Sequence, residues 1–202
     1  HEWTAVGSTR VRGNGCPYCS NQRLLIGFND MATTHPDLAA QLVETDPTTL
    51  VAGTRRTLNW ICAQGHQWAA PGYHRVTGRG CPYCSNKRLL PGVNDMATTH
   101  PDLAAELVGT DPATVIAGTN KVLRWRCLSH GHEWRTSGNK RASGGQNCPY
   151  CGNQSLLPGF NDLAATHPHL AAELIGADPT AVMAGSETKY LWRFHQGHEW
   201  QT

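Results

Sequence analysis

The tetrapeptide Cys-Pro-Tyr-Cys occurs three times in this chain of 202 residues, at Cys16–Cys19, Cys81–Cys84 and Cys148–Cys151. The copies are separated by 65 and 67 residues, and a Gly-His-x-Trp step recurs at a similar spacing. A period of this length indicates an array in which each repeat is one supersecondary unit. Because the chain begins and ends inside a repeat, we expect it to be a segment of a longer array.

Each Cys-Pro-Tyr-Cys is accompanied by a second pair of metal-binding side chains, one cysteine and one histidine, earlier in the chain. The second repeat supplies Cys62, His66, Cys81 and Cys84, and the third supplies Cys127, His132, Cys148 and Cys151. Structural zinc is bound by four nitrogen and sulfur ligands arranged as a tetrahedron. The pattern therefore predicts two complete Zn²⁺ sites.

The first and fourth repeats are incomplete. The first contains only His1, Cys16 and Cys19, and it forms a third zinc site if the missing upstream ligand is supplied. The fourth has Phe194 where the first cysteine should be, so we expect no metal there. In the third repeat, His130 competes with His132 as the imidazole ligand, but the register of the repeats favours His132.

Two alternatives compete with the zinc interpretation. An even number of cysteines, 8 in this chain, is compatible with disulfides in a secreted protein, but disulfides leave the recurrent histidine unexplained. Cys-Pro-Tyr-Cys also resembles the active-site tetrapeptide of glutaredoxins, whose reactive thiolate lies at a helix N-terminus. No thioredoxin-like β-α-β pattern surrounds it here. We therefore favour zinc over both alternatives.

Each repeat divides into a metal half and a helical half. In the third repeat, an aromatic strand over Val122–Cys127 leads to the Cys–His turn, and a second strand leads through a glycine-rich turn to Cys-Pro-Tyr-Cys. In the helical half before it, the proline of Thr-His-Pro suits the first helical position, where an N–H is not needed. We predict that this helix includes Leu107 and ends at Gly109 and Asp111-Pro112, and that a shorter helix starts at Asp95.

The predicted fold is a series of small α+β modules, each stabilised by zinc and built from a knuckle, a β-hairpin and short helices. We place the first module at residues 1–53, the second at 54–118, the third at 119–185 and the start of a fourth at 186–202. Modules of this size bury little apolar surface. A structural zinc adds roughly 10–16 kcal/mol of apparent binding energy, which becomes folding energy.

The string Trp-x-Cys-x-x-Gly-His-x-Trp, followed by arginine, Gly-Cys-Pro-Tyr-Cys and Pro-x-Leu-Ala-x-x-Leu, resembles the probable zinc-ribbon repeat family of bacteria and plants. The resemblance covers essentially the whole chain. It implies tandem treble-clef zinc fingers with a helix at the second cysteine pair, and the same two sets of four ligands. Members often accompany nuclease domains, which implies DNA targeting and a nuclease or other effector outside this segment. The chain departs from the family at Leu42, Leu107 and Leu174, where tryptophan is common, and at Phe194.

Basic residues are confined to the metal halves. The formal net charge is only +2, yet residues 54–90 hold six basic and no acidic side chains, and residues 91–118 hold four acidic and no basic ones. Residues 119–157 hold six basic and one acidic side chain, and residues 158–185 hold three acidic and no basic ones. A repeated basic surface is typical of contact with nucleic-acid phosphates. The alternative is a charge ladder, in which acidic helices pair with basic residues of neighbouring modules.

The repeats differ mainly after His-x-Trp and just before the metal loop, where a constant scaffold carries variable side chains. We predict that these stretches contact bases, and that the recurrent arginines contact phosphates. Two alternatives are that the loops vary without function and that the arginine stacks on tryptophan. The predicted nucleic-acid contacts are Arg10, Arg12, Arg55, Arg56, Tyr73, His74, Arg75, Arg79, Lys87, Arg88, Lys121, Arg124, Arg135, Asn139, Lys140 and Arg141.

No catalytic site is predicted, because zinc with four protein ligands has no open position. The sequence predicts a non-enzymatic, zinc-dependent array that recognises double-stranded DNA for a larger protein or complex. The alternative is a protein-interaction or assembly scaffold built of structural zinc modules. No apolar run is long enough to span a membrane. The many reduced cysteines favour a reducing compartment, so we expect the cytoplasm, and association with the nucleoid if the source is bacterial.

Overall fold

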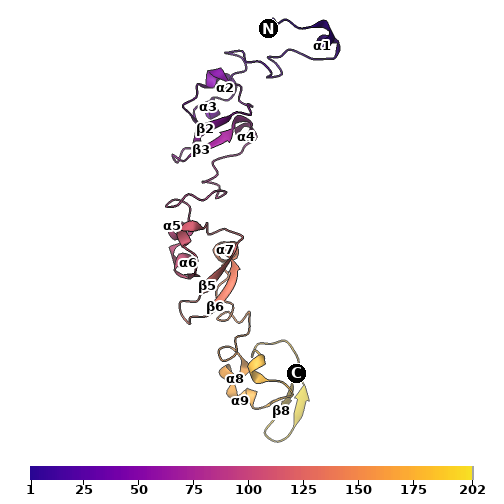
Figure 1. Ribbon diagram of the computed structural model, residues 1–202. Helices are drawn as coiled ribbons and strands as arrows, with labels where there is room; N and C mark the ends of the chain where they lie inside the picture. Colours follow the sequence, from indigo (N-terminus) through magenta and orange to yellow (C-terminus); the bar gives the residue numbers. More distant parts are fainter. Residues whose placement is uncertain (202) are drawn as a thin grey trace. The chain divides into compact units, whose positions relative to one another are not determined.

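The computed structural model describes residues 1–201, and its contacts divide the chain into two compact units, His1–Arg88 and Leu89–Thr202. Within the described residues, three antiparallel sheets follow one another along the chain, with strand orders β1-β2-β3, β4-β5-β6 and β7-β8-β9. Two short helices precede each sheet (Figure 1). The α+β class and the β-hairpin predicted from the sequence are confirmed.

The elements recur in the same order in each repeat. The first unit contains α1 (Gly7–Val11), α2 (Met31–Thr34), α3 (Pro36–Ala39), β1 (Leu42–Val43), the 3₁₀ helix η1 (Pro47–Thr49), β2 (Thr57–Ile61), β3 (Gln67–Pro71) and α4 (Gly72–Val76). The second unit contains α5 (Met96–Thr99), α6 (Pro101–Ala105), β4 (Leu107–Val108), η2 (Pro112–Thr114), β5 (Val122–Arg126), β6 (Glu133–Ser137) and α7 (Gly138–Ala142), then α8 (Leu163–Thr166), α9 (Pro168–Ala171), β7 (Leu174–Ile175), η3 (Pro179–Ala181), β8 (Leu191–Arg193) and β9 (Glu199–Gln201). No helix in the described part of the chain is long and apolar enough to cross a membrane.

Aspartate and proline start the helices, as predicted. The Asp95 carboxylate accepts a hydrogen bond from the Thr98 N–H at 2.8 Å and caps α5. Pro101 occupies the first turn of α6, where its missing N–H has no cost. Asp162 caps α8 in the same way, and the hydrogen bond from the Ala165 N–H lowers the pKa of this aspartate despite its burial.

The predicted extent of the second helix is wrong. α6 ends at Ala105, and Leu107–Val108 forms β4, which pairs with β5 through Leu107 and Trp125. Asp111 does not end a helix either, because its carboxylate accepts from the Ala113 N–H at 2.9 Å and so starts η2. Leu107–Val108 thus adds a third strand to the hairpin, where its backbone groups pair with those of β5.

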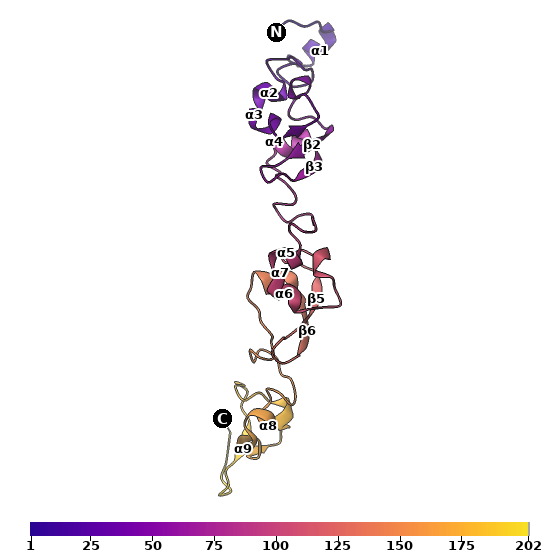
Figure 2. The ribbon, with the colours of Figure 1, turned by 90° about the vertical axis from the view of Figure 1, so that its left-hand side faces the viewer.

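The core lies between each helical half and the metal half that follows it. Met31 from α2 and Trp60 from β2 are both 0% exposed and belong to one buried cluster. Met96 and Trp125 take the equivalent places in the second unit, where Figures 1 and 2 both show α5 and α6 beside β5. In both clusters, a helical half packs against the metal half that follows it in the sequence. The predicted module boundaries instead grouped each helical half with the metal half that precedes it.

A short helix follows each complete hairpin, where the sequence predicted only a glycine-rich turn. α7 starts at Gly138, and a Cβ atom there would lie 2.5 Å from the Ala117 carbonyl oxygen and 2.8 Å from Thr119 Cγ2. Glycine therefore allows α7 to pack against the end of the helical half. This packing places the recurrent arginine of α7 over the core.

Candidate metal centre

Four side chains of the second repeat converge on one point. The ligand atoms of Cys62, His66, Cys81 and Cys84 all lie within 4.8 Å of one another. Cys84 Sγ lies 3.7 Å from Cys62 Sγ and 3.2 Å from His66 Nδ1. A tetrahedral zinc with Zn–S bonds of about 2.3 Å and Zn–N bonds of about 2.0 Å separates its sulfur ligands by about 3.8 Å and sulfur from nitrogen by about 3.5 Å. The spacing therefore fits one zinc ion bound by three sulfurs and one imidazole.

The third repeat builds the same cluster from Cys127, His132, Cys148 and Cys151. His132 Nδ1 lies 3.6 Å from Cys148 Sγ and 3.7 Å from Cys151 Sγ, and the two sulfurs Cys127 Sγ and Cys151 Sγ are 3.7 Å apart. His130 is also present, with Nδ1 3.4 Å from Cys151 Sγ and its ring stacked on that of His132. His130 Nδ1 is therefore as far from Cys151 Sγ as two ligands of one tetrahedral zinc ion would be from each other.

Two tight turns bring the ligand pairs together. Between β2 and β3, the Cys62 N–H donates to the His66 carbonyl at 3.0 Å, and Gly65 adopts a φ of +79°, which the turn requires. After Cys81 the chain makes one hydrogen-bonded turn, which is followed by Asn86 with a φ of +53°. The helix that the family resemblance implied at this cysteine pair is therefore only a turn, because Asn86 leaves the right-handed region.

The first and fourth repeats depart from the complete sites at the expected residues. His1 Nδ1 lies 3.6 Å from both Cys16 Sγ and Cys19 Sγ, so three ligands of the first repeat converge. In the fourth repeat, the Phe194 N–H bonds to the His198 carbonyl at 2.8 Å, which forms the loop without the first sulfur. Within residues 1–201, the clusters of three or more potential metal ligands belong to the first three repeats.

The cysteine side chains are suited to metal binding rather than to disulfides. None of the eight cysteines is joined to another by a disulfide, which disagrees with the disulfide alternative. Desolvation and hydrogen bonding to the Cys81 side chain raise the pKa of Cys84 to about 11, and the same causes, with Cys148 as the neighbour, raise the pKa of Cys151 to about 12. Crowded thiols oppose one another's ionisation, and a divalent cation at their centre removes that opposition.

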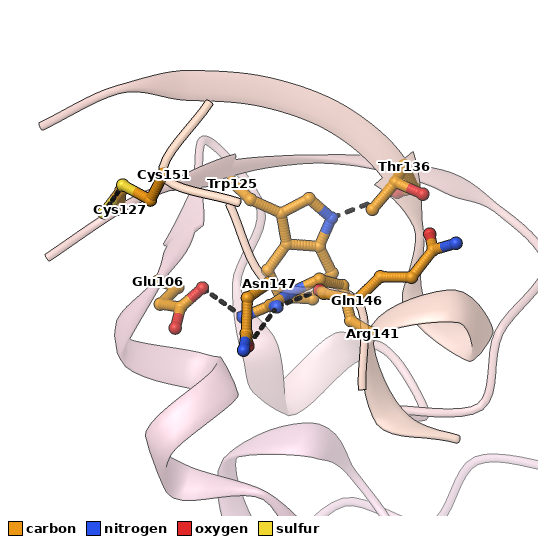
Figure 3. A network of polar contacts seen from close by, with 8 residues as sticks. All are labelled: Glu106, Trp125, Cys127, Thr136, Arg141, Gln146, Asn147 and Cys151. Carbon is orange, nitrogen blue, oxygen red and sulfur yellow. Dashed lines mark hydrogen bonds and ion pairs between the residues drawn. The ribbon is translucent and has the colours of Figure 1, made fainter. Parts of the chain in front are cut away.

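The recurrent arginine lies against the tryptophan core. Arg141 is only 5% exposed, and its Cζ atom lies 5.4 Å from the ring centre of Trp125 and 5.5 Å from that of Trp134. Figure 3 shows its guanidinium donating to the Glu106 carboxylate and to the Gln146 carbonyl. The glutamate comes from the helical half, 35 residues earlier, so the arginine joins the two halves of the module.

Arg75 has the same place in the second repeat. Its Cζ atom lies 5.4 Å from the Trp60 ring and 5.3 Å from the Trp68 ring, and it donates to Gln41 Oε1 at 2.5 Å. We predicted phosphate contacts for Arg75 and Arg141, but both guanidinium groups are directed into the module, where they stack on tryptophan rings and bond to the helical half. Arg10 also stacks on tryptophan, although it is exposed. The stacking alternative is therefore correct, and the partners Gln41 and Glu106 were missed because no local pattern relates them to the arginine.

The remaining predicted contacts lie at the surface, apart from the half-buried His74. Arg124 donates to Glu133 at 2.8 Å on the outer face of the β5–β6 hairpin, and Arg135 is its neighbour across the two strands. Arg126, which the sequence did not single out, is also exposed and donates to Glu133. The exposed predicted residues are Arg10, Arg12, Arg55, Arg56, Tyr73, Arg79, Lys87, Arg88, Lys121, Arg124, Arg135, Asn139 and Lys140.

Comparison with known protein families agrees with the geometry of the two complete sites. A family model described as "Probable Treble clef zinc finger domain" matches residues 38–87 and 104–154. Each match starts inside a helical half and ends after the next Cys-Pro-Tyr-Cys, so it contains one complete set of four zinc ligands. No curated protein matches the chain.

Proposed function

The chain belongs to the probable treble clef zinc finger family, and on this premise we propose that it is a non-enzymatic, zinc-dependent array that binds double-stranded DNA for a larger protein or complex. The observation that carries the proposal is the distribution of charge. Arg55, Arg56, Arg79 and Lys87 are all exposed, and residues 54–90 contain no acidic side chain. An exposed basic surface without acidic residues favours contact with the phosphates of a duplex.

We propose a structural role for the zinc ions. Each complete site supplies four protein ligands, which leaves no position on zinc for water or a substrate. Asp95, the carboxylate of the recurrent Asn-Asp block, is engaged as a helix cap. Catalysis would therefore come from a nuclease or other effector domain outside this segment. Eight cysteines kept reduced as zinc ligands suit a reducing compartment, which supports the cytoplasm as the place of action.

The alternative function is a scaffold for protein assembly, and one observation favours it. Glu133 is bonded to both Arg124 and Arg126, and Glu106 is bonded to Arg141, so part of the basic charge of the third repeat is neutralised within the protein. The metal half of the second repeat, residues 54–90, contains no acidic residue that could pair with its arginines and lysine in this way. The second repeat is therefore the stronger candidate for phosphate contact.

The test is selection of a randomised duplex DNA pool by the zinc-loaded protein at near-physiological salt, followed by sequencing of the bound fraction. Enrichment of a motif that disappears on chelation supports modular recognition of DNA. Binding without enrichment reduces the array to an anchor on the phosphate backbone, whose affinity should fall steeply with salt. Absence of binding overturns the proposal and favours the scaffold, whose packed interface should respond weakly to salt.

A further inference from the structure

The two complete repeats contain the same surface groove. In the second repeat it lies between β3, α4 and the Cys-Pro-Tyr-Cys turn, with Trp68 and Pro82 in its lining and a volume of about 260 Å³. In the third repeat the groove has a volume of about 340 Å³ and is lined by Trp134 and Pro149, at the equivalent positions. Each groove is thus built on residues that the zinc site and the tryptophan core hold in place.

The rim of the groove in the second repeat is basic. His74, Arg79, Lys87 and Arg88 all line it, and no acidic residue is among its lining residues. Arg79 is placed by a contact of 3.3 Å between its guanidinium and His74 Nε2, and Arg88 lies over the Tyr83 ring at 5.5 Å. A concave surface lined by charges of one sign concentrates the field that they produce. An anionic ligand is therefore favoured in this groove.

The rim of the equivalent groove is different in the third repeat. Gln146, Gln154 and Ser155 stand at the positions of Arg79, Lys87 and Arg88, and Arg135 replaces an alanine on the strand side. Amide and hydroxyl groups donate and accept hydrogen bonds but carry no charge. The frame of the groove is therefore constant while the chemistry of its rim changes between repeats.

We propose that this groove is the surface through which each module contacts duplex DNA, and that its rim sets how each module binds. The proposal rests on the DNA-binding function proposed above. Phosphodiester groups occupy the basic groove of the second repeat, whereas the amides of the third repeat bond to the polar edges of the nucleotides. Charge complementarity with the basic rim of the second repeat selects nucleic acid as the occupant.

The experiment exchanges the rims and measures DNA binding as a function of salt. The double variant R79Q/K87Q gives the second repeat the side chains that the third repeat already carries, so the fold is expected to tolerate them. If both residues bind phosphates, the slope of log K against log salt falls by about 0.9 for each phosphate that is no longer neutralised, or about 1.8 in all. The control K189Q/R193Q removes two exposed charges that lie outside both grooves and are not among the proposed DNA contacts, and it should leave the slope nearly unchanged.

A reciprocal variant, Q146R/Q154K, should raise the affinity and steepen the salt dependence by a similar amount. Zinc stoichiometry and circular dichroism are measured on every variant, so that a loss of fold is recognised. An equal effect of R79Q/K87Q and K189Q/R193Q, with DNA binding intact in the wild type, overturns the groove as the contact surface and leaves the proposed function standing. A wild-type protein that binds no DNA overturns the proposed function itself and the groove proposal with it.

Discussion

A histidine that coordinates zinc has a neighbour able to replace it in one repeat but not in the other. His130 and His132 both approach Cys151 Sγ, at 3.4 and 3.7 Å. The second repeat has Gln64 at the position of His130, and an amide is a poor zinc ligand beside three thiolates. The third site therefore has a substitute for its imidazole, and the second site has none.

We predict that His132→Ala leaves the zinc stoichiometry unchanged, because His130 completes the tetrahedron. The matched variant His66→Ala should lose one tightly bound ion. Cobalt substitution measures both effects, since tetrahedral Co²⁺ bound to thiolates absorbs in the visible region and the titration end point gives the number of sites. Loss of an ion from His132→Ala to the same extent as from His66→Ala would show that His130 is not a ligand.

The recurrent arginine has a different hydrogen-bonding partner in each of the two complete repeats. Arg141 bonds to a glutamate, Glu106, whereas Arg75 bonds to a glutamine, Gln41, at the equivalent position. Both arginines stack on two tryptophans. The neutral pairing in the second repeat shows that the module does not need the acidic partner.

We predict that Glu106→Gln costs about 1 kcal/mol or less, the net value of a typical hydrogen bond. Arg141→Ala should cost on the order of 3 kcal/mol, because it removes the guanidinium that stacks on two tryptophans and also leaves the partly buried Glu106 carboxylate without its cation. Denaturant unfolding of the zinc-loaded protein, followed by tryptophan fluorescence, measures both. Equal costs for the two variants would mean that the ion pair, rather than the stacked guanidinium, supplies the stability.

Packing of the short helices explains why glycine recurs at one position. A Cβ atom at Gly138 would lie 2.5 Å from the Ala117 carbonyl, and one at Gly72 would lie 2.6 Å from the Ala52 carbonyl. Gly7, at the same place in the first repeat, has no atom within 4 Å of a built Cβ. The requirement for glycine thus comes from contact between α4 or α7 and the helical half before it.

Gly138→Ala should therefore destabilise the third module by about 1–3 kcal/mol, the usual cost of overpacking. Gly7→Ala is the matched control and should have no destabilising effect, since its methyl group meets open space. Thermal unfolding of the two zinc-loaded variants compares them. If the two unfolding midpoints were lowered equally, the loss of stability would come from alanine at the start of a helix. The close approach between residue 138 and the Ala117 carbonyl would then make no contribution.

At the scale of the whole chain, each complete repeat has its own zinc ligands and its own tryptophan cluster. The core around Trp60 and that around Trp125 are formed from residues of different compact units. A structural zinc contributes roughly 10–16 kcal/mol to such small units, so a module without its metal is expected to unfold. The modules of the array should therefore unfold one at a time rather than together.

Cys148→Ser tests this independence. The variant should bind one zinc ion fewer, and the indole signals of Trp125 and Trp134 in a ¹⁵N–¹H correlation spectrum should collapse to unfolded positions. The signals of Trp60 and Trp68 should not move. Cys81→Ser is the reciprocal control and should affect only the second repeat. Unfolding of both clusters by either single variant would mean that the modules fold cooperatively.

Ligand type and spacing were sufficient to predict the zinc sites, and local signals predicted several of the short elements. Ligand type and spacing are local properties: Cys62 and His66 are four residues apart, and the Cys-x-x-Cys pair brings two sulfurs to one ion whatever surrounds them. Helix starts at Asp95 and Pro101 were likewise predictable, because a cap and a first-turn proline act within a few residues. The hairpin strand that contains Trp125 followed from its aromatic composition.

The way in which the helical and metal halves combine became clear only from the folded chain. Leu107 continues a helical pattern in sequence but lies in a strand paired with Trp125, and Arg141 resembles a phosphate contact but bonds to Glu106. Gly138 has a steric role that depends on Ala117. Each of these outcomes depends on a partner about 18 to 35 residues away in sequence, and such a contact arises only when the chain is packed. The local sequence pattern does not predict such a contact, because the free energy that favours the contact comes from burial and long-range hydrogen bonding.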